Sequence, residues 1–169
     1  QSSHRHAWRC TDADTPTTGT WAQTPAIIYQ TFTSLGLERF QIRVNNRKIL
    51  NGFYAMLGLT EQSGDIMRTV DKLDKIGAEK VRTCLMEDVG LTDEQAGEIL
   101  KFIAITGSNG EVLAALEGYR GRSDIFDEGL NELTTVVKYL AAFGVPQENF
   151  AVDLTIARGL DYYTGTVYE

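Results

Sequence analysis

The feature that most constrains this chain is a hydrophobic period that changes twice along its length. Residues 40–45 alternate apolar Ile42 and Val44 with polar neighbours, which is the period-2 pattern of a half-buried strand. Residues 60–145 lack this alternation and repeat their apolar side chains every three or four positions instead. The alternation returns over residues 151–157. The pattern predicts an all-helical module inserted between two strand-bearing pieces.

Local signals place the helices. Thr92 followed by Gln95 is a capping-box signature, and Asn45 or Asn46 can cap the helix expected after the first strand. Pro25 suits the first turn of an earlier helix. Helices are therefore predicted over residues 25–35, 47–57, 65–76, 79–89, 92–105, 110–119 and 124–143.

Strands are predicted at residues 40–45, 150–157 and 162–168, as parts of one antiparallel sheet. The expected fold class is α/β in the broad sense and α+β more narrowly. It consists of a mostly helical insertion module attached to a partial antiparallel sheet.

Composition excludes several classes of protein. With 43% hydrophobic and 23% charged residues, the chain is neither disordered nor fibrous, and its net charge of −7 argues against a protein that coats nucleic acid. Cys10 and Cys84 have no metal-ligand spacing, and His4 and His6 lack a suitably spaced carboxylate, so no metal site is expected. No membrane span or signal peptide is readable, and we expect a soluble, cytoplasmic protein.

The last twelve residues carry the densest functional chemistry. Arg158 offers a planar fork of donors for a carboxylate or phosphate, and Gly159 permits close backbone approach to a ligand. Tyr162 and Tyr163 point to opposite faces of a regular strand. On residue chemistry alone a structural role is more common for such a set than a catalytic one. Two interpretations are open for Arg43, Arg47 and Lys48. They bind a ligand, or they form a solvated cationic rim.

Two segments resemble one known family. The segment RGLDYYTGTVYE, residues 158–169, resembles the first histidine-specific signature of histidyl-tRNA synthetases, RGLDYYTGTVFE, with Tyr168 in place of Phe. The segment IRVNNRKILNG, residues 42–52, resembles the family's IRVNNRKLLNG. The resemblance covers roughly residues 25–169. Residues 1–24 match poorly, and no family role is carried over to them.

The resemblance implies a class II synthetase core that activates histidine with ATP to histidyl-adenylate and transfers it to tRNA(His). It makes Arg158 the catalytic residue that stabilises charge on the α-phosphate, and it assigns histidine recognition to Tyr162 and Tyr163. ATP is then a substrate, with Mg expected in the complete enzyme and no cofactor bound by this chain alone. A homodimer is expected for the complete enzyme.

The resemblance also divides the chain. It implies an uncertain segment at 1–24, catalytic-core pieces at 25–59 and 149–169, and a helical insertion at 60–148 that approaches the acceptor stem of the tRNA. The cations grouped most densely in the insertion are Lys72, Lys75, Lys80 and Arg82. They alternate with acidic residues, so a solvated face is the competing interpretation. Phosphate contact is the role implied by the family.

Segments resembling the family's first class motif, the arginine-bearing core of its second, its third motif and its anticodon-binding domain are not found. The isolated chain is therefore expected not to catalyse. Two alternatives remain. One is the synthetase-like regulatory subunit of ATP phosphoribosyltransferase, against which Arg158 and the long insertion argue. The other is a free-standing helical interaction module.

Overall fold

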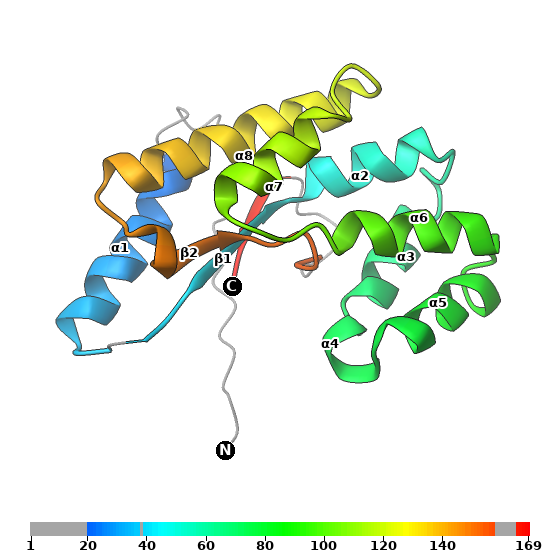
Figure 1. Cartoon of the computed structure of the whole chain (residues 1–169), viewed down its shortest axis with the longest axis horizontal. Helices are drawn as coiled ribbons and strands as arrows, with labels where there is room; N and C mark the ends of the chain where they lie inside the picture. The colour runs from blue at the N-terminus through cyan, green and yellow to red at the C-terminus, as the bar shows by residue number, and fades with distance from the viewer. Residues whose placement is uncertain (1–19, 38, 158–164) are drawn as a thin grey trace.

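The computed structural model describes residues 20–37, 39–157 and 165–169. Figure 1 shows the helices arranged around one small sheet. The elements in chain order are α1 (Thr20–Ser34), β1 (Ile42–Asn46), α2 (Arg47–Met56), α3 (Ser63–Val70), α4 (Leu73–Ile76), α5 (Ala78–Glu87), α6 (Asp93–Ile103), α7 (Asn109–Glu117), α8 (Asp124–Ala142), a 3-10 turn (Gln147–Asn149), β2 (Phe150–Val152) and β3 (Thr166–Tyr168). Every residue from 47 to 149 is described and none lies in a strand, so the predicted strand-free region is confirmed.

The sheet has the order β2-β1-β3, with β1 in the centre. β1 runs antiparallel to β3, with Val44 opposite Tyr168, and parallel to β2, with Val44 opposite Val152. The predicted wholly antiparallel sheet is therefore wrong for the β1–β2 pair. A period of two identifies a strand but not its direction, and the long helical connection from β1 to β2 allows the crossover that parallel strands require. The mostly helical fold with a partial sheet is confirmed.

β2 is shorter than the predicted strand at 150–157, because a turn begins at Asp153. One carboxylate oxygen of Asp153, Oδ1, accepts hydrogen bonds from the Thr155 backbone N at 2.9 Å and from Thr155 Oγ1 at 2.6 Å. The backbone N of Ile156 donates to the Asp153 carbonyl at 3.3 Å. Leu154 and Ile156 are still buried, so the alternation correctly located core residues although the backbone leaves the sheet.

α8 packs lengthwise against α2 and also contacts α1 and β1 (Figure 1). Two glycines allow the helices to approach closely. A Cβ built at Gly52 would lie 2.6 Å from the backbone N of Phe126, and one at Gly129 would lie 2.8 Å from the backbone N of Ile49. Both distances are too short for any side chain, so glycine is required where α2 and α8 cross. The insertion boundary predicted at residue 148 stays a prediction. α8 precedes this residue in the chain, although it packs against α1, α2 and β1, which belong to the predicted catalytic core.

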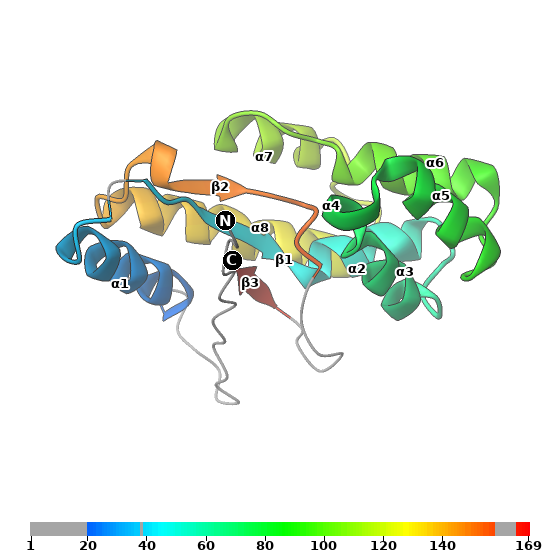
Figure 2. The ribbon, with the colours of Figure 1, turned by 90° about the horizontal axis from the view of Figure 1, so that it is seen from below.

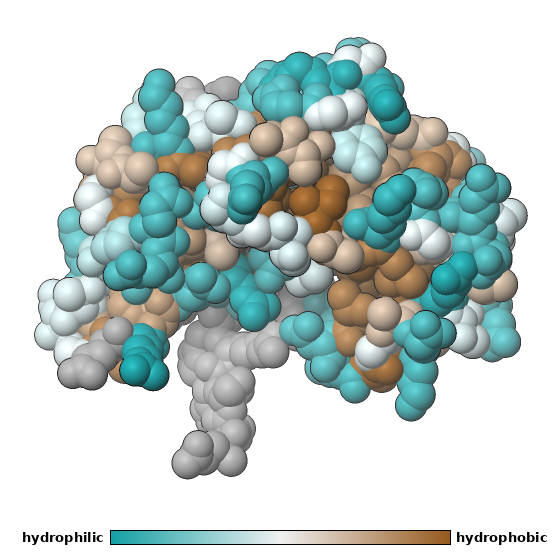
Figure 3. Space-filling model, in the orientation of Figure 1, coloured by the Kyte–Doolittle hydropathy of each residue, from teal (hydrophilic) through white to brown (hydrophobic). Residues whose placement is uncertain are grey.

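An aromatic cluster connects the α2–α8 pair to the outer helices. The rings of Phe53 and Phe102 stack with centroids 3.9 Å apart, and Tyr119 packs edge-on against Phe102 at 5.3 Å. The buried apolar residues form one contiguous core that extends from α1 to β3. Figure 3 shows apolar side chains gathered over α4 and between α4 and α6, surrounded by hydrophilic ones. None of the described helices is long and apolar enough to cross a membrane.

Candidate functional site

The two segments singled out by the sequence come together in the structure. β1 is the central strand of the sheet and continues directly into α2. β3 pairs with β1. Figure 2 shows β1 between β2 and β3, with the turn after β2 descending towards the β1–α2 junction. This junction, residues 45–48, contacts the chain on both sides of residues 158–164.

Asn45 contacts the chain before that segment. It is fully buried in β1, and its side-chain Nδ2 donates to the carbonyl of Ile156 at 2.9 Å and to that of Leu154 at 3.4 Å. Its Oδ1 accepts a hydrogen bond from the backbone N of Asn46 at 2.8 Å. The amide therefore connects the central strand to the turn that leads towards Arg158.

Asn46 and Arg47 contact the chain after that segment. Asn46 Nδ2 donates to Thr166 Oγ1 at 3.3 Å, and the backbone N of Arg47 donates to the Gly165 carbonyl at 3.0 Å. Asn46 Oδ1 also accepts from the backbone N of Lys48 at 2.9 Å, which confirms it as the cap of α2. Three consecutive residues thus bond to the described chain on either side of residues 158–164.

Glu132 of α8 supports this junction. Its Oε2 accepts from Asn46 Nδ2 at 2.6 Å, and its Oε1 accepts from Lys48 Nζ at 2.5 Å. Lys48 Nζ also donates to Glu128 Oε1 at 2.7 Å. Partial burial alone would lower the pKa of Lys48, but the bonds and charges of Glu128 and Glu132 outweigh it, so this pKa is raised. Lys48 is therefore part of the scaffold and not a solvated rim.

Arg47 is buried as well, contrary to a solvated-rim interpretation. Its Nη2 lies 3.2 Å from the sulfur of Met67 on α3. Tyr54, further along α2, is fully buried, and its hydroxyl has no hydrogen-bond partner among the described residues. Burial raises the pKa of Tyr54, while the positive charge of Arg47 acts in the opposite direction.

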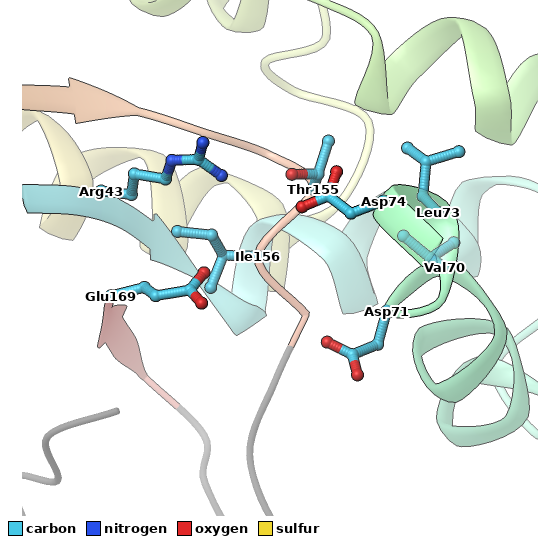
Figure 4. A pocket seen from close by; sticks show the side chains of 8 residues that line it. All are labelled: Arg43, Val70, Asp71, Leu73, Asp74, Thr155, Ile156 and Glu169. Carbon is cyan, nitrogen blue, oxygen red and sulfur yellow. The ribbon is translucent and has the colours of Figure 1, made fainter. Parts of the chain in front are cut away.

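A polar pocket lies between the sheet and the helical module (Figure 4). Arg43 enters it from β1 and forms an ion pair with Asp153, with Nη1 and Oδ2 3.3 Å apart. The opposite wall comes from the end of α3 and from α4. The lining comprises Arg43, Val70, Asp71, Leu73, Asp74, Thr155, Ile156 and Glu169. One guanidinium and several carboxylates give the pocket both donors and acceptors, next to the turn that leads to Arg158.

The predicted site residues differ in what the structure shows of them. Arg158, Tyr162 and Tyr163 lie outside the described residues. The candidate tRNA-binding lysines, Lys72, Lys75 and Lys80, are all exposed on the α4–α5 stretch.

Arg82 lies on the same stretch but has a different environment. Its Nε and Nη2 form a two-pronged bond to Asp93, each at 2.8 Å. The hydrogen bonds to Asp93 raise the pKa of Arg82. Among the described residues, no group of three or more His, Cys, Asp or Glu side chains has the geometry of a metal site.

Sequence reasoning identified Asn46 as a possible cap but missed the roles of Asn45, Asp153 and Glu132. Asn45 falls on the face of the strand that the alternation assigns to Gln41 and Arg43, so no local signal marks it as buried. Its bonding partners are 109 and 111 residues away, so no local pattern reveals them.

The arrangement of these elements matches that of a solved aminoacyl-tRNA synthetase. A crystal structure of histidyl-tRNA synthetase from Nostoc sp. PCC 7120 superimposes with a TM-score of 0.88 and 41% identity over 92% of this chain and 37% of that one. The family model for histidyl-tRNA synthetase matches residues 22–169. The chain belongs to the histidyl-tRNA synthetase family.

Curated relatives agree. The histidine–tRNA ligase of Clostridium tetani is 50% identical over 148 residues, which is 88% of this chain and 33% of that protein. That of Xanthomonas axonopodis pv. citri is 44% identical over 156 residues, again 88% of this chain and 32% of that protein. The chain spans about a third of the length of these relatives. A Bacillus halodurans structure described as an ATP phosphoribosyltransferase regulatory subunit/histidyl-tRNA synthetase has a TM-score of 0.71 and 20% identity, so it shares the fold.

Proposed function

We propose that this chain forms part of a histidine–tRNA ligase, which activates histidine with ATP and transfers the histidyl group to tRNA(His). The observation that carries the proposal is the direct bonding between the two family-like segments. β1 pairs with β3, and residues 45–47 bond to the described chain on both sides of residues 158–164. The 50% identity to a curated histidine–tRNA ligase supports it, and the regulatory-subunit alternative has only a fold-level match.

Arg158 is proposed to act on the α-phosphate of ATP. The histidine carboxylate attacks this phosphorus, and the bond to the bridging oxygen breaks, so that pyrophosphate leaves and histidyl-adenylate forms. Additional negative charge develops on the phosphate oxygens in the transition state. A guanidinium fixed beside them stabilises that charge without reorganisation, and its planar fork can bond two oxygens at once. Its contribution is therefore larger in the transition state than in the ground state.

Tyr162 and Tyr163 are proposed to select histidine. A phenol hydroxyl can bond an imidazole nitrogen, and an aromatic ring can form one wall of the pocket. A site built from such groups rejects amino acids that leave its polar atoms unpaired. ATP is proposed to bind as its magnesium complex. The complete enzyme is proposed to be a homodimer in the cytoplasm.

Lys72, Lys75 and Lys80 are proposed to contact phosphates of the tRNA acceptor stem. All three are exposed, and they lie on the short α4–α5 stretch of the helical module. Arg82 was grouped with them by sequence. Its donors are bonded to Asp93, so we expect a smaller contribution from it.

The test uses the complete polypeptide that contains this chain and measures histidine-dependent exchange of pyrophosphate into ATP. Arg158→Lys keeps the charge but removes the fork, so the exchange rate should fall by about 100-fold or more while the KM for histidine changes little. Tyr163→Phe is the matched comparison and should weaken histidine selection more than it lowers the rate at saturation. A near-normal exchange rate for Arg158→Lys, together with a lowered melting temperature, would make Arg158 a structural residue.

A further inference from the structure

Asn45 and Asn46 are two consecutive asparagines with no exposed surface. Asn45 lies on a central strand, where β-branched apolar residues are usual and where a buried amide is unfavourable unless it is fully bonded. Its side chain is bonded entirely to backbone groups, two of them on the turn after β2. The protein therefore accommodates a polar group in its core to connect two distant parts of the chain.

The turn itself does not need Asn45 in order to form. Asp153 and Thr155 close it through their own bonds, and Ile156 completes it through the Asp153 carbonyl. The start of the turn is held to β1 by the Asp153 backbone N, which donates to the Val44 carbonyl at 3.0 Å, and by the ion pair of Asp153 with Arg43. What Asn45 adds is a hold on the end of the turn, at Leu154 and Ile156. The amide at 2.9 Å from the Ile156 carbonyl sets where the chain stands two residues before Arg158.

Two residues of extended chain span at most about 7 Å, so the position of Ile156 limits the region that residue 158 can reach. The other side is fixed similarly, because Asn46 bonds the Thr166 hydroxyl and Glu132 of α8 bonds Asn46. The β1 strand thus determines both where the chain departs towards residue 158 and where it returns after residue 164.

We propose that Asn45 is a positioning residue for adenylate formation, and that Asn46 has the same role at the returning end. The proposal rests on the proposed function, in which Arg158 contacts the α-phosphate. Neither asparagine needs to touch a substrate. Each acts by fixing backbone from which the reactive segment starts or ends.

The deciding substitution is Asn45→Asp in the complete polypeptide. Aspartate keeps the size of the side chain and the oxygen that accepts from the Asn46 backbone N. It replaces the donor with a second oxygen, which then faces the carbonyls of Leu154 and Ile156. The end of the turn loses its two bonds from Asn45. The turn keeps its own internal bonds, and its first residue, Asp153, keeps its backbone bond to the Val44 carbonyl and its ion pair with Arg43.

Asn109 provides a matched control. It is also a buried asparagine, and its Nδ2 donates to the Phe150 carbonyl at 3.1 Å while its Oδ1 accepts from the backbone N of Val152 at 2.8 Å. Asn109→Asp therefore removes the same kind of bond from the same stretch of chain, but at β2 and not at the turn. Melting temperature, kcat and histidine KM of pyrophosphate exchange, and hydrogen exchange at the Ile156 amide are measured for both variants.

We expect Asn45→Asp to lower kcat by about 10- to 100-fold more than Asn109→Asp does, with similar losses of melting temperature and little change in histidine KM. The Ile156 amide should exchange faster in Asn45→Asp only, because the turn, although still closed by its own bonds, should open more often once its end is no longer bonded to β1. Equal kcat values for the two variants would overturn the proposal. Arg158→Lys is assayed alongside. If it leaves kcat intact, the proposed role of Arg158 fails, whereas a large loss there with equal asparagine variants overturns only the positioning role.

A second pair of variants tests the returning end and avoids any folding failure of Asn45→Asp. Thr166→Val removes the hydroxyl that accepts from Asn46 Nδ2, whereas Thr166→Ser retains it. We expect kcat to fall about threefold to tenfold in the valine variant and to be largely restored in the serine variant. Equal kcat values for valine and serine would overturn the role of Asn46.

Discussion

The core helices α2 and α8 and the outer helices α4, α5 and α6 place their polar groups differently. At the core helices, Lys48 and Glu132 are bonded in a largely enclosed network, and Gly52 brings the backbones into contact. On the outer helices the Arg82–Asp93 pair is solvent-accessible, with 38% and 65% of the two side chains exposed. Substitutions of polar groups at the core helices should therefore affect folding more than those on the outer helices.

The largest contrast should come from adding one methyl group to a helix of each kind. In Gly52→Ala the new Cβ would lie 2.6 Å from the Phe126 backbone, so α2 and α8 must separate, and the free energy of unfolding should fall by about 3 kcal/mol. In Gly97→Ala on α6 the nearest atom is the end of the Arg82 side chain at 3.7 Å. Alanine favours a helix, so stability should rise by about 0.5–1 kcal/mol.

Urea denaturation of the two glycine variants measures both effects. The free energy of unfolding should change in opposite directions in the two variants, because the chemical change is identical and only the surroundings differ. A Gly52→Ala variant as stable as the unmodified chain would show that α2 and α8 are not in close backbone contact.

Ion pairs should show the same contrast with a smaller effect. Lys48→Met keeps the apolar stem but removes the cation that pairs with the partly buried Glu132 and the exposed Glu128, and should cost about 1–2 kcal/mol. Arg82→Met breaks an exposed pair and should change stability little. Thermal and urea unfolding of both variants check this, and an equal loss in the two would remove the distinction between the regions.

Alkaline pH sharpens the comparison, because both perturbed core groups respond in the same direction. The folded-state pKa values of Lys48 and Tyr54 are raised, so their contributions are complete below the unfolded values of about 10 to 10.4 and are lost as pH rises towards the folded ones. Stability should therefore decline above about pH 10. Tyr54→Phe removes a buried hydroxyl and should flatten part of this decline without loss at neutral pH. A decline as steep in Tyr54→Phe as in the unmodified chain would assign it to other groups.

The outer helices were the easier part to predict from sequence, for a physical reason. The capping box of Thr92 and Gln95 forms as expected because its two partners are three residues apart. The direction of β2 and the bonds of Asn45 depend on contacts more than a hundred residues apart. The Asp153–Thr155 turn was concealed by an alternation that correctly marked Leu154 and Ile156 as buried.

The candidate site divides in the same way. Exposure of Lys72, Lys75 and Lys80 followed from their charged surroundings, but nothing local showed that Arg82 would bond to Asp93, eleven residues away. Roles for Arg158, Tyr162 and Tyr163 came from resemblance and remain predictions. The sequence located the reactive segment, and the structure shows which residues bond to the chain on either side of it.

Charge reversal of the outer lysines should have the smallest effect on folding of the substitutions considered. The same change should have a large effect on tRNA binding. Replacing Lys72 and Lys75 with Glu should leave the melting temperature nearly unchanged, because both side chains are exposed. Binding of tRNA(His) by the complete polypeptide should weaken markedly, and its dependence on salt concentration should become shallower by about one phosphate contact per lysine. Lys101→Glu with Lys138→Glu is the control, since these lysines are also exposed and the pair changes the net charge equally. Overall charge alone would weaken binding equally in the two double variants. A loss confined to Lys72 and Lys75, measured by filter binding over a series of salt concentrations, would assign the contact to the α4–α5 stretch, and equal losses would rule it out.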